Sequence, residues 1–160
     1  MQGLRNSSIL LSSTNIMYKP RYIQYVNLPK IPADIISSLP QDIESYNKET
    51  QGNYHWTNTH NEQLNEWAQQ HISNDIYFAF QMMTGDLERH KDIGTLTKFV
   101  YIIDTGGCNV VTKFWDDDLR LLDEYVIEPH RWHILKADTY HSVEGIEADK
   151  HRWSVTARIF

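Results

Sequence analysis

The sequence contains a single cysteine, Cys108, which excludes an internal disulfide and fits a reducing compartment or simply a chain that needs no disulfide, and we expect a cytoplasmic protein. No apolar run approaches about 18 residues, and the N-terminal MQGLRNSSILLSS has no sustained apolar stretch. We therefore expect neither a transmembrane segment nor a signal peptide. Lys and Arg form no block and the net charge is −6, which disfavours a nucleic-acid partner.

The 160 residues, 41% hydrophobic and 22% charged, have the size and composition of one soluble globular domain. The sequence therefore predicts a single domain over residues 1–160. Residues 1–20 are rich in Ser and Asn and aperiodic, and we interpret them as a loose N-terminal arm.

Helical patterns are confined to the first half of the chain. Residues 29–43 (PKIPADIISSLPQDI) predict a short helix that ends at Pro40. Residues 61–72 (NEQLNEWAQQHI) predict the clearest helix, capped by Asn61 and with one apolar stripe. The polar residues 44–60 between them predict a long loop, of the kind that often carries function.

From Ile76 onward the apolar period changes from that of a helix to that of a strand. Ile76, Phe78, Phe80 and Met82 share one face. Short strands behind a helical region predict a mainly β fold with N-terminal helices. We expect a double-stranded β-helix (a jelly roll, cupin-like) with two facing antiparallel sheets. The predicted strands are 22–28, 76–82, 98–104, 109–115, 124–128, 132–136, 140–144 and 152–160, the third and fourth joined at Gly106-Gly107 as a hairpin or sheet neighbours.

His90-Lys91-Asp92 places an imidazole and a carboxylate two residues apart. In extended backbone these side chains leave the same face, with Cα atoms about 7 Å apart. A facial triad for ferrous iron needs one more imidazole and leaves three coordination positions open. His141 lies 49 residues after Asp92, and Arg152 follows eleven residues later with Ser154 on the same strand face.

This order of His-x-Asp, a distal His and Arg-x-Ser resembles that of the Fe(II)- and 2-oxoglutarate-dependent dioxygenases, over roughly residues 75–160. The approach to His141, W-x-x-L-x-A-D-T-x-H-S-V, is similar to that in prolyl and aspartyl/asparaginyl hydroxylases of this superfamily. Asp92 departs from the membrane-anchored aspartyl/asparaginyl type, which usually lacks a carboxylate ligand.

The resemblance implies a hydroxylase that uses Fe(II) as cofactor and 2-oxoglutarate as cosubstrate, with release of succinate and CO₂. The distal carboxylate of 2-oxoglutarate needs a bidentate cation, which suits arginine better than lysine. The implied metal ligands are His90, Asp92 and His141, and the implied cosubstrate-binding residues are Arg152, Ser154, Tyr101 and Arg158. Thr112 is a further residue expected to face the cavity. The substrate is expected to be a peptide or protein side chain or a small metabolite, and no motif identifies it.

Two other interpretations stay open at this point. A zinc site can be built from His130, His133 and His141, since three imidazoles suit catalytic zinc. A jelly roll can also serve as a non-catalytic module that binds a ligand or partner, because fold alone does not fix function. The remaining histidines, which are His55, His60, His71 and His151, are expected on the surface or in loops.

Overall fold

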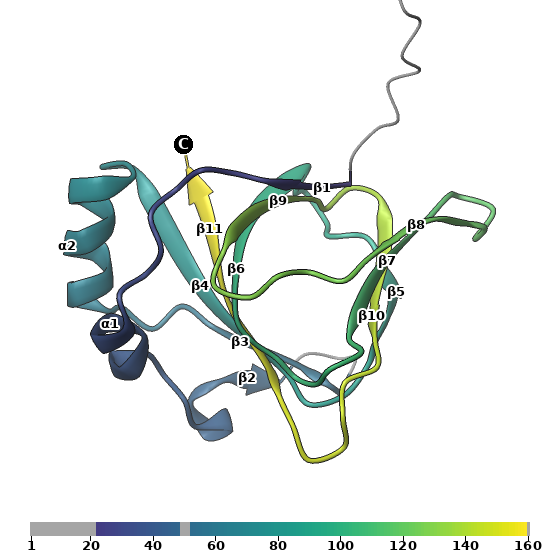
Figure 1. Ribbon diagram of the computed structural model, residues 1–160, viewed down its shortest axis with the longest axis horizontal. Helices are drawn as coiled ribbons and strands as arrows, with labels where there is room; N and C mark the ends of the chain where they lie inside the picture. The colour runs from purple at the N-terminus through teal and green to yellow at the C-terminus, as the bar shows by residue number, and fades with distance from the viewer. Residues whose placement is uncertain (1–21, 49–51, 160) are drawn as a thin grey trace, which may run out of the picture.

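The structure, a computed structural model, describes residues 22–48 and 52–159, and the predicted N-terminal arm lies outside this part. Antiparallel strands curve around a common interior, and helices cover one side (Figure 1). The helical segments are α1 (Ala33–Ser38), η1 (Ile43–Ser45) and α2 (Glu62–His71). The strands are β1 (Ile23–Tyr25), β2 (Asn47–Lys48), β3 (Tyr54–Thr57), β4 (Ile76–Met83), β5 (Leu87–His90), β6 (Thr97–Thr105), β7 (Val111–Trp115), β8 (Leu121–Tyr125), β9 (Trp132–Lys136), β10 (Tyr140–Glu144) and β11 (Arg152–Ile159).

The last eight strands pair in a nested order that defines the fold. β7 pairs with β8, β6 with β9, β5 with β10 and β4 with β11, each antiparallel. This is one long hairpin, and it winds on itself because β6 also pairs with β11 and β7 with β10. The result is a sheet in the order β1-β9-β6-β11-β4-β3-β2 facing a sheet in the order β5-β10-β7-β8. The predicted jelly roll, or double-stranded β-helix, is confirmed.

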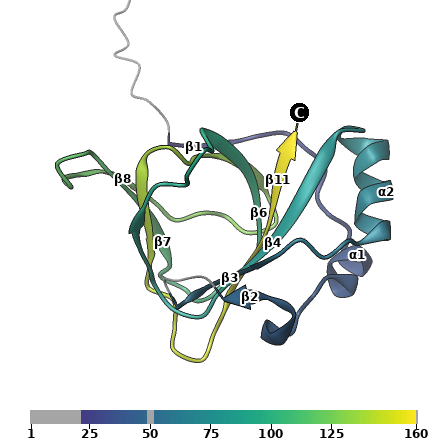
Figure 2. The same cartoon turned by 180° about the vertical axis from the view of Figure 1, so that it is seen from behind.

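The larger sheet has an apolar outer face that the helices cover (Figure 2). Phe80 and Val155, on neighbouring strands, are 1% and 0% exposed and pack in one cluster with Leu64 and Trp67 of α2. Full burial of such a side chain stabilises the fold by about 1.5–3 kcal/mol. The predicted helix is confirmed, with the Asn61 side chain accepting a 2.8 Å hydrogen bond from the Leu64 amide. The apolar residues that alternate from Ile76 onward therefore lie on the helix-covered face of the sheet.

The inner face of the same sheet carries the alternate residues, several of them polar. Gln81 on β4 and Arg152, Ser154 and Thr156 on β11 line an internal cavity. Part of the remaining interior is filled by apolar side chains, among them Phe114 and Ile102, each 0% exposed. The barrel therefore combines a packed apolar cluster with a hollow polar region.

The turn at Gly106-Gly107 does not make β6 and β7 neighbours, which corrects that prediction. β6 belongs to the larger sheet and β7 to the smaller one, so the turn connects the two sheets. Gly106 has a φ of +80°, and a Cβ there lies 2.8 Å from the backbone nitrogen of Arg152. Only glycine fits this connection without strain, because it adopts positive φ freely and presents no side chain to β11.

The predicted loop over residues 44–60 also needs correction, because it contains β2 and β3. β3 pairs with β4 and extends the larger sheet. Within the described ranges, the structure contains no helix of the length and apolarity that a membrane crossing requires.

Candidate metal and anion site

The cavity between the two sheets has a volume of about 760 Å³. Its walls come from both sheets and from the segment that joins β5 to β6. His90, Asp92, His141, Arg152 and Ser154 all line it. The sequence-predicted metal and cosubstrate residues therefore meet in one place, with two exceptions that are described below.

A β-bulge turns His90 toward the interior. On β10, His141 pairs with His90 and Val143 pairs with Leu87, so three residues of β5 span the same distance as two of β10. The extra residue allows both Leu87 and His90 to line the cavity, although they are three positions apart. Asp92 follows the end of β5, and its amide donates to the carbonyl of Ala137 at 3.0 Å.

Both imidazoles are oriented by backbone carbonyl groups. Nδ1 of His90 lies 2.9 Å from the Glu88 oxygen, and Nδ1 of His141 lies 2.8 Å from the Thr139 oxygen. A carbonyl oxygen only accepts hydrogen bonds, so in each ring Nδ1 carries the proton. Each Nε2 therefore points toward Asp92, and with an ion bound it would present its lone pair to that ion, as metal-ligating histidines do.

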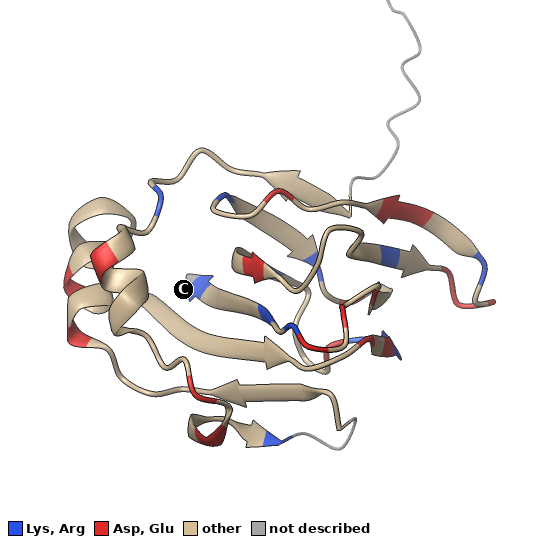
Figure 3. Cartoon of the chain, turned by 60° about the horizontal axis from the view of Figure 1, so that its bottom comes forward, with Lys and Arg blue, Asp and Glu red and all other residues tan. Residues whose placement is uncertain are grey.

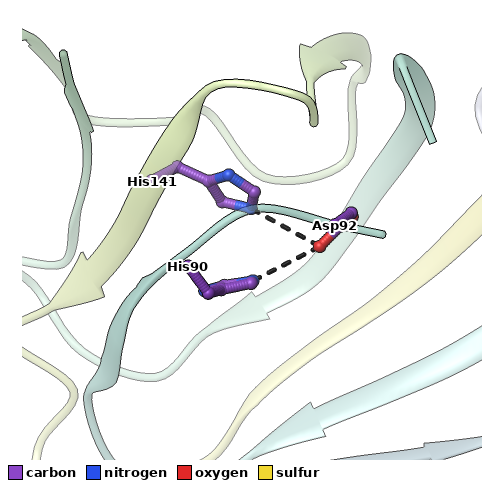
Figure 4. Close-up of side chains that lie close together, drawn as sticks. All are labelled: His90, Asp92 and His141. Carbon is purple, nitrogen blue, oxygen red and sulfur yellow. Dashed lines mark ion pairs between the residues drawn. The ribbon is translucent and has the colours of Figure 1, made fainter. Parts of the chain in front are cut away.

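The three donor atoms converge, as Figure 4 shows. Nε2 of His90 lies 3.3 Å from Oδ1 of Asp92, and Nε2 of His141 lies 3.9 Å from the same oxygen. The potential ligand atoms all lie within 4.8 Å of one another, and among the described residues only this group of three meets that criterion. Ligands about 2.1 Å from one ion and at right angles lie about 3 Å apart, so a small shift brings these atoms onto a common ion.

The protonation states also suit a cation. Burial lowers the pKa of His141 to about 4, so this ring is neutral at pH 7. Burial alone raises the pKa of Asp92, but His90 and the Lys98 ammonium outweigh burial and hold that pKa well below its usual range. Lys98 lies 2.6 Å from Oδ2 of Asp92, which leaves Oδ1 for the centre of the cluster. Two imidazole nitrogens and one carboxylate oxygen are the donor set of a non-haem ferrous site.

Arg152 places an unpaired charge inside the barrel. The residue is 5% exposed, and its guanidinium donates to the Thr112 hydroxyl at 3.4 Å. No carboxylate lies within ion-pair distance of Arg152 in the described part of the chain. Burial lowers the pKa of Arg152 to about 10, so the group remains charged at pH 7. A buried charge without a counterion costs several kcal/mol, and an anionic ligand would remove that cost.

His133 belongs to the same part of the cavity, although the sequence reasoning named it only in the alternative zinc set. The residue is fully buried and lines the cavity, and its Nε2 has no hydrogen-bond partner among the residues that the structure describes. Burial, together with the nearby Arg152 charge, lowers its pKa to about 4. A buried ring nitrogen without a partner is typical of a position that a ligand completes. No local pattern distinguishes His133, because its burial depends on which face of β9 turns inward.

Tyr101 and Arg158 are the two exceptions. Tyr101 is wrongly placed by the sequence reasoning: Lys98 and Val100 of β6 line the cavity, whereas Tyr101 packs on the outer face against Trp132, with ring centroids 5.1 Å apart. Arg158 does line the cavity but lies six residues along β11 from Arg152. Thr112, also expected to face inward, does so.

The proposed zinc set is not brought together. His141 and His133 line the cavity, but His130 is exposed and lies on the outer side, with its ring 6.2 Å from that of Tyr101. His60, His71 and His151 are exposed as expected, whereas His55 is 8% exposed, which corrects its assignment to the surface.

No protein-family model matches the chain, and no curated protein matches it. Among solved structures, it is similar to a cupin superfamily protein from Desulfitobacterium hafniense, with 12% identity, a TM-score of 0.40, and coverage of 86% of this chain and 98% of the other. It is also similar to a hydroxypropylphosphonic acid epoxidase from S. wedmorenis, with 8% identity, a TM-score of 0.46, and coverage of 76% and 59%.

Proposed function

We propose that this protein is an Fe(II)- and 2-oxoglutarate-dependent oxygenase that hydroxylates a peptide side chain or a small metabolite. The observation that carries the proposal is a cavity lined both by a His-Asp-His cluster and by a buried guanidinium that has no carboxylate partner among the described residues. The first group suits a ferrous ion and the second suits the free end of a dicarboxylate.

His90, Asp92 and His141 would hold the ion from one side, with their Nε2 and Oδ1 atoms as ligands. When bound, ferrous iron supplies the activation of O₂ that couples oxidation of 2-oxoglutarate to hydroxylation, with release of succinate and CO₂. The chain contributes the orientation of these ligands through the carbonyls of Glu88 and Thr139. Lys98 contributes by fixing the second oxygen of Asp92.

Arg152 would pair with the distal carboxylate of 2-oxoglutarate. Its planar guanidinium can donate two parallel hydrogen bonds to one carboxylate, and burial keeps water from competing. Ser154, 3% exposed and two residues along the same strand face, supplies a hydroxyl donor. Nε2 of His133 is a further polar atom without a protein partner beside this position.

The substrate would enter from the part of the cavity that β3 borders. Tyr54, Trp56 and Asn58 line the cavity there, within a segment whose polar composition predicted a functional loop. Aromatic side chains of this kind provide contact area for an apolar group while leaving polar atoms to fix its orientation.

The proposal is tested by adding Fe(II) and then 2-oxoglutarate to the purified protein without oxygen. We expect one iron per chain and a visible metal-to-ligand charge-transfer band that appears only when both are present. Zn(II) in place of Fe(II) is the matched control and gives no band. Binding of 2-oxoglutarate that is independent of metal would instead favour a non-catalytic anion-binding module, and absence of metal binding would exclude the oxygenase.

A further inference from the structure

The cavity carries an excess of positive charge that the proposed cosubstrate does not account for. The cavity is lined by Lys91, Lys98, Arg152 and Arg158, whereas Asp92 is the one carboxylate among the described residues that line it. The whole chain has the opposite balance, with a net charge of −6. Helices α1 and α2 carry acidic residues and neither Lys nor Arg, as Figure 3 shows. The described lining of the cavity therefore has a charge balance opposite in sign to that of the whole chain.

Two of the four cations already have carboxylate partners. Lys98 pairs with Asp92 at 2.6 Å and Lys91 with Asp117 at 2.7 Å. Within the described ranges, the side chains of the two arginines on β11 donate hydrogen bonds to hydroxyl groups only. Arg152 donates to Thr112 at 3.4 Å, and Arg158 donates to Thr95 at 3.0 Å. Across the described residues, neither guanidinium has a carboxylate within ion-pair distance.

The two arginines lie at different ends of the cavity. They share one face of β11 and are six residues apart, or about 20 Å at roughly 3.3 Å per residue. Arg152 is buried, whereas Arg158 is exposed and lies beside Tyr77 in the strand register. Tyr77 and Ile93 also line the cavity and are 51% and 100% exposed, so this end is open to solvent.

Chain segments that carry or contact the metal cluster also extend to the open end of the cavity. Lys98, which contacts Asp92, directly precedes Phe99, and Phe99 pairs with Ala157 beside Arg158. Thr95 lies in the same β5–β6 segment as Asp92. In the proposed function, the two carboxylates of 2-oxoglutarate are taken by the ion and by Arg152. The guanidinium at the open end then remains for a different anion.

We propose that the Arg158 guanidinium, which contacts Thr95 and lies beside Tyr77, forms a second anion site at the open end of the cavity, which binds a carboxylate or phosphate group on a ligand with an apolar body. The apolar body would lie against Trp56, Tyr77 and Ile93, which line the same cavity. The anion site follows from the charges and contacts of the cavity, and its assignment to the hydroxylation substrate rests on the proposed function.

The site is tested by binding alone, without iron or turnover. Phenylacetate, phenyl phosphate and neutral phenylacetamide are titrated by ligand-observed NMR into protein containing Zn(II) and saturating 2-oxoglutarate. We expect at least one of the anions to bind about tenfold more tightly than the amide, because a charge-assisted hydrogen bond replaces a neutral one. The stronger of the two anions identifies the chemical group. Equal binding of all three would overturn the proposal.

Three variants locate the site. Arg158→Gln is expected to remove the preference for the anion, whereas Thr95→Val retains it, because the guanidinium stays while its hydrogen bond to the loop is lost. Arg152→Gln is expected to retain the preference, with or without 2-oxoglutarate. A preference that persists in Arg158→Gln or disappears in Arg152→Gln would contradict the assignment. The anion preference of Arg152→Gln is also measured without cosubstrate. This measurement can therefore support the anion site even if 2-oxoglutarate does not bind to the protein.

Discussion

The two faces of the β4–β11 strand pair differ in composition and in what they contact. Outward, Phe80, Val155 and Ala157 pack under the helices and are each at most 1% exposed. Inward, the alternate positions Arg152 and Ser154 on β11 are also buried, at 5% and 3% exposed, but they face a cavity. One strand thus contributes to an apolar core on one side and to a polar chamber on the other.

The outer face contributes to the stability of the fold, whereas the inner face contributes to ligand binding. Apolar burial on the outer face stabilises the folded chain by an amount that grows with the area removed from water. A guanidinium buried on the inner face without a counterion opposes folding. Such a residue is explained by a ligand rather than by stability. Substitutions on the outer face should therefore change stability, and substitutions on the inner face should change binding.

The largest expected effect is on metal binding at the inner face. His141→Ala removes one of three converging donors, so we expect metal affinity to fall by at least about 100-fold, more than the loss of an outer-shell partner costs. Isothermal titration with Zn(II), or with Fe(II) under anaerobic conditions, measures the change. His130→Ala is the matched control, because that exposed ring lies outside the cluster. Equal losses in both variants would break the assignment of the triad.

On the outer face, the expected effect is on the free energy of unfolding. Phe80→Ala leaves a cavity beneath α2, and such truncations cost about 3–5 kcal/mol. Urea denaturation measures the change. Ser154→Ala, on the inner face of the neighbouring strand, should alter stability by about 1 kcal/mol or less. If Phe80→Ala weakened metal binding in the folded protein while stability stayed unchanged, the division between the faces would be wrong.

The next effect concerns the cosubstrate. Arg152→Ala should weaken 2-oxoglutarate binding at least about 100-fold and leave the ion bound, because one-sided loss of a buried ion pair costs roughly 3–5 kcal/mol. Arg152→Lys should recover only part of the affinity, since one ammonium cannot reproduce the bidentate contact. Titration of 2-oxoglutarate into iron-loaded wild type and both variants measures this. Unchanged affinity in Arg152→Ala would move the anion contact to Arg158 or Lys98, or exclude the cosubstrate.

Much of the fold was predictable because its strands have local signals. The strands 132–136 and 140–144 were predicted with the bounds that the structure gives them, and the alternation from Ile76 identified β4. β3 was missed because it has four residues in a polar segment and becomes a strand by pairing with β4. The relation of β6 to β7 was also missed, since a Gly-Gly turn has the same local signature whether it joins neighbours or connects two sheets.

The site residues that follow one another at fixed spacing could be predicted from the sequence. Those whose role depends on which face of a strand turns toward the cavity could not. On β11, the alternation of Arg152 and Ser154 with apolar neighbours fixed their common face. On β6 and β9, residues of both faces are buried, so no local pattern distinguishes Tyr101 from Val100 or identifies His133 as a neighbour of Arg152. The bulge that turns His90 inward is likewise a property of its pairing with β10.

The smallest of these effects is a pH dependence of stability that arises from the inner face. The pKa of His133 is lowered by burial to about 4, against about 6.5 in an unfolded chain. As the pH falls below about 6.5, His133 binds a proton in the unfolded chain, whereas in the folded protein it does so only near pH 4. The free energy of unfolding therefore decreases as the pH falls through that range. Between pH 7 and pH 5 the loss from this residue is about 2 kcal/mol.

His133→Gln should therefore reduce the difference in unfolding free energy between pH 7 and pH 5 by about that amount in metal-free protein. Urea denaturation at the two pH values measures it, and the contribution of His141 is common to both proteins and cancels. His151→Gln, at an exposed position, serves as the control. If His133→Gln kept the wild-type pH dependence, the ring would already be solvated or protonated in the folded state. The inner face would then be more accessible to water, and the charge of Arg152 better solvated, than the comparison of the two faces requires.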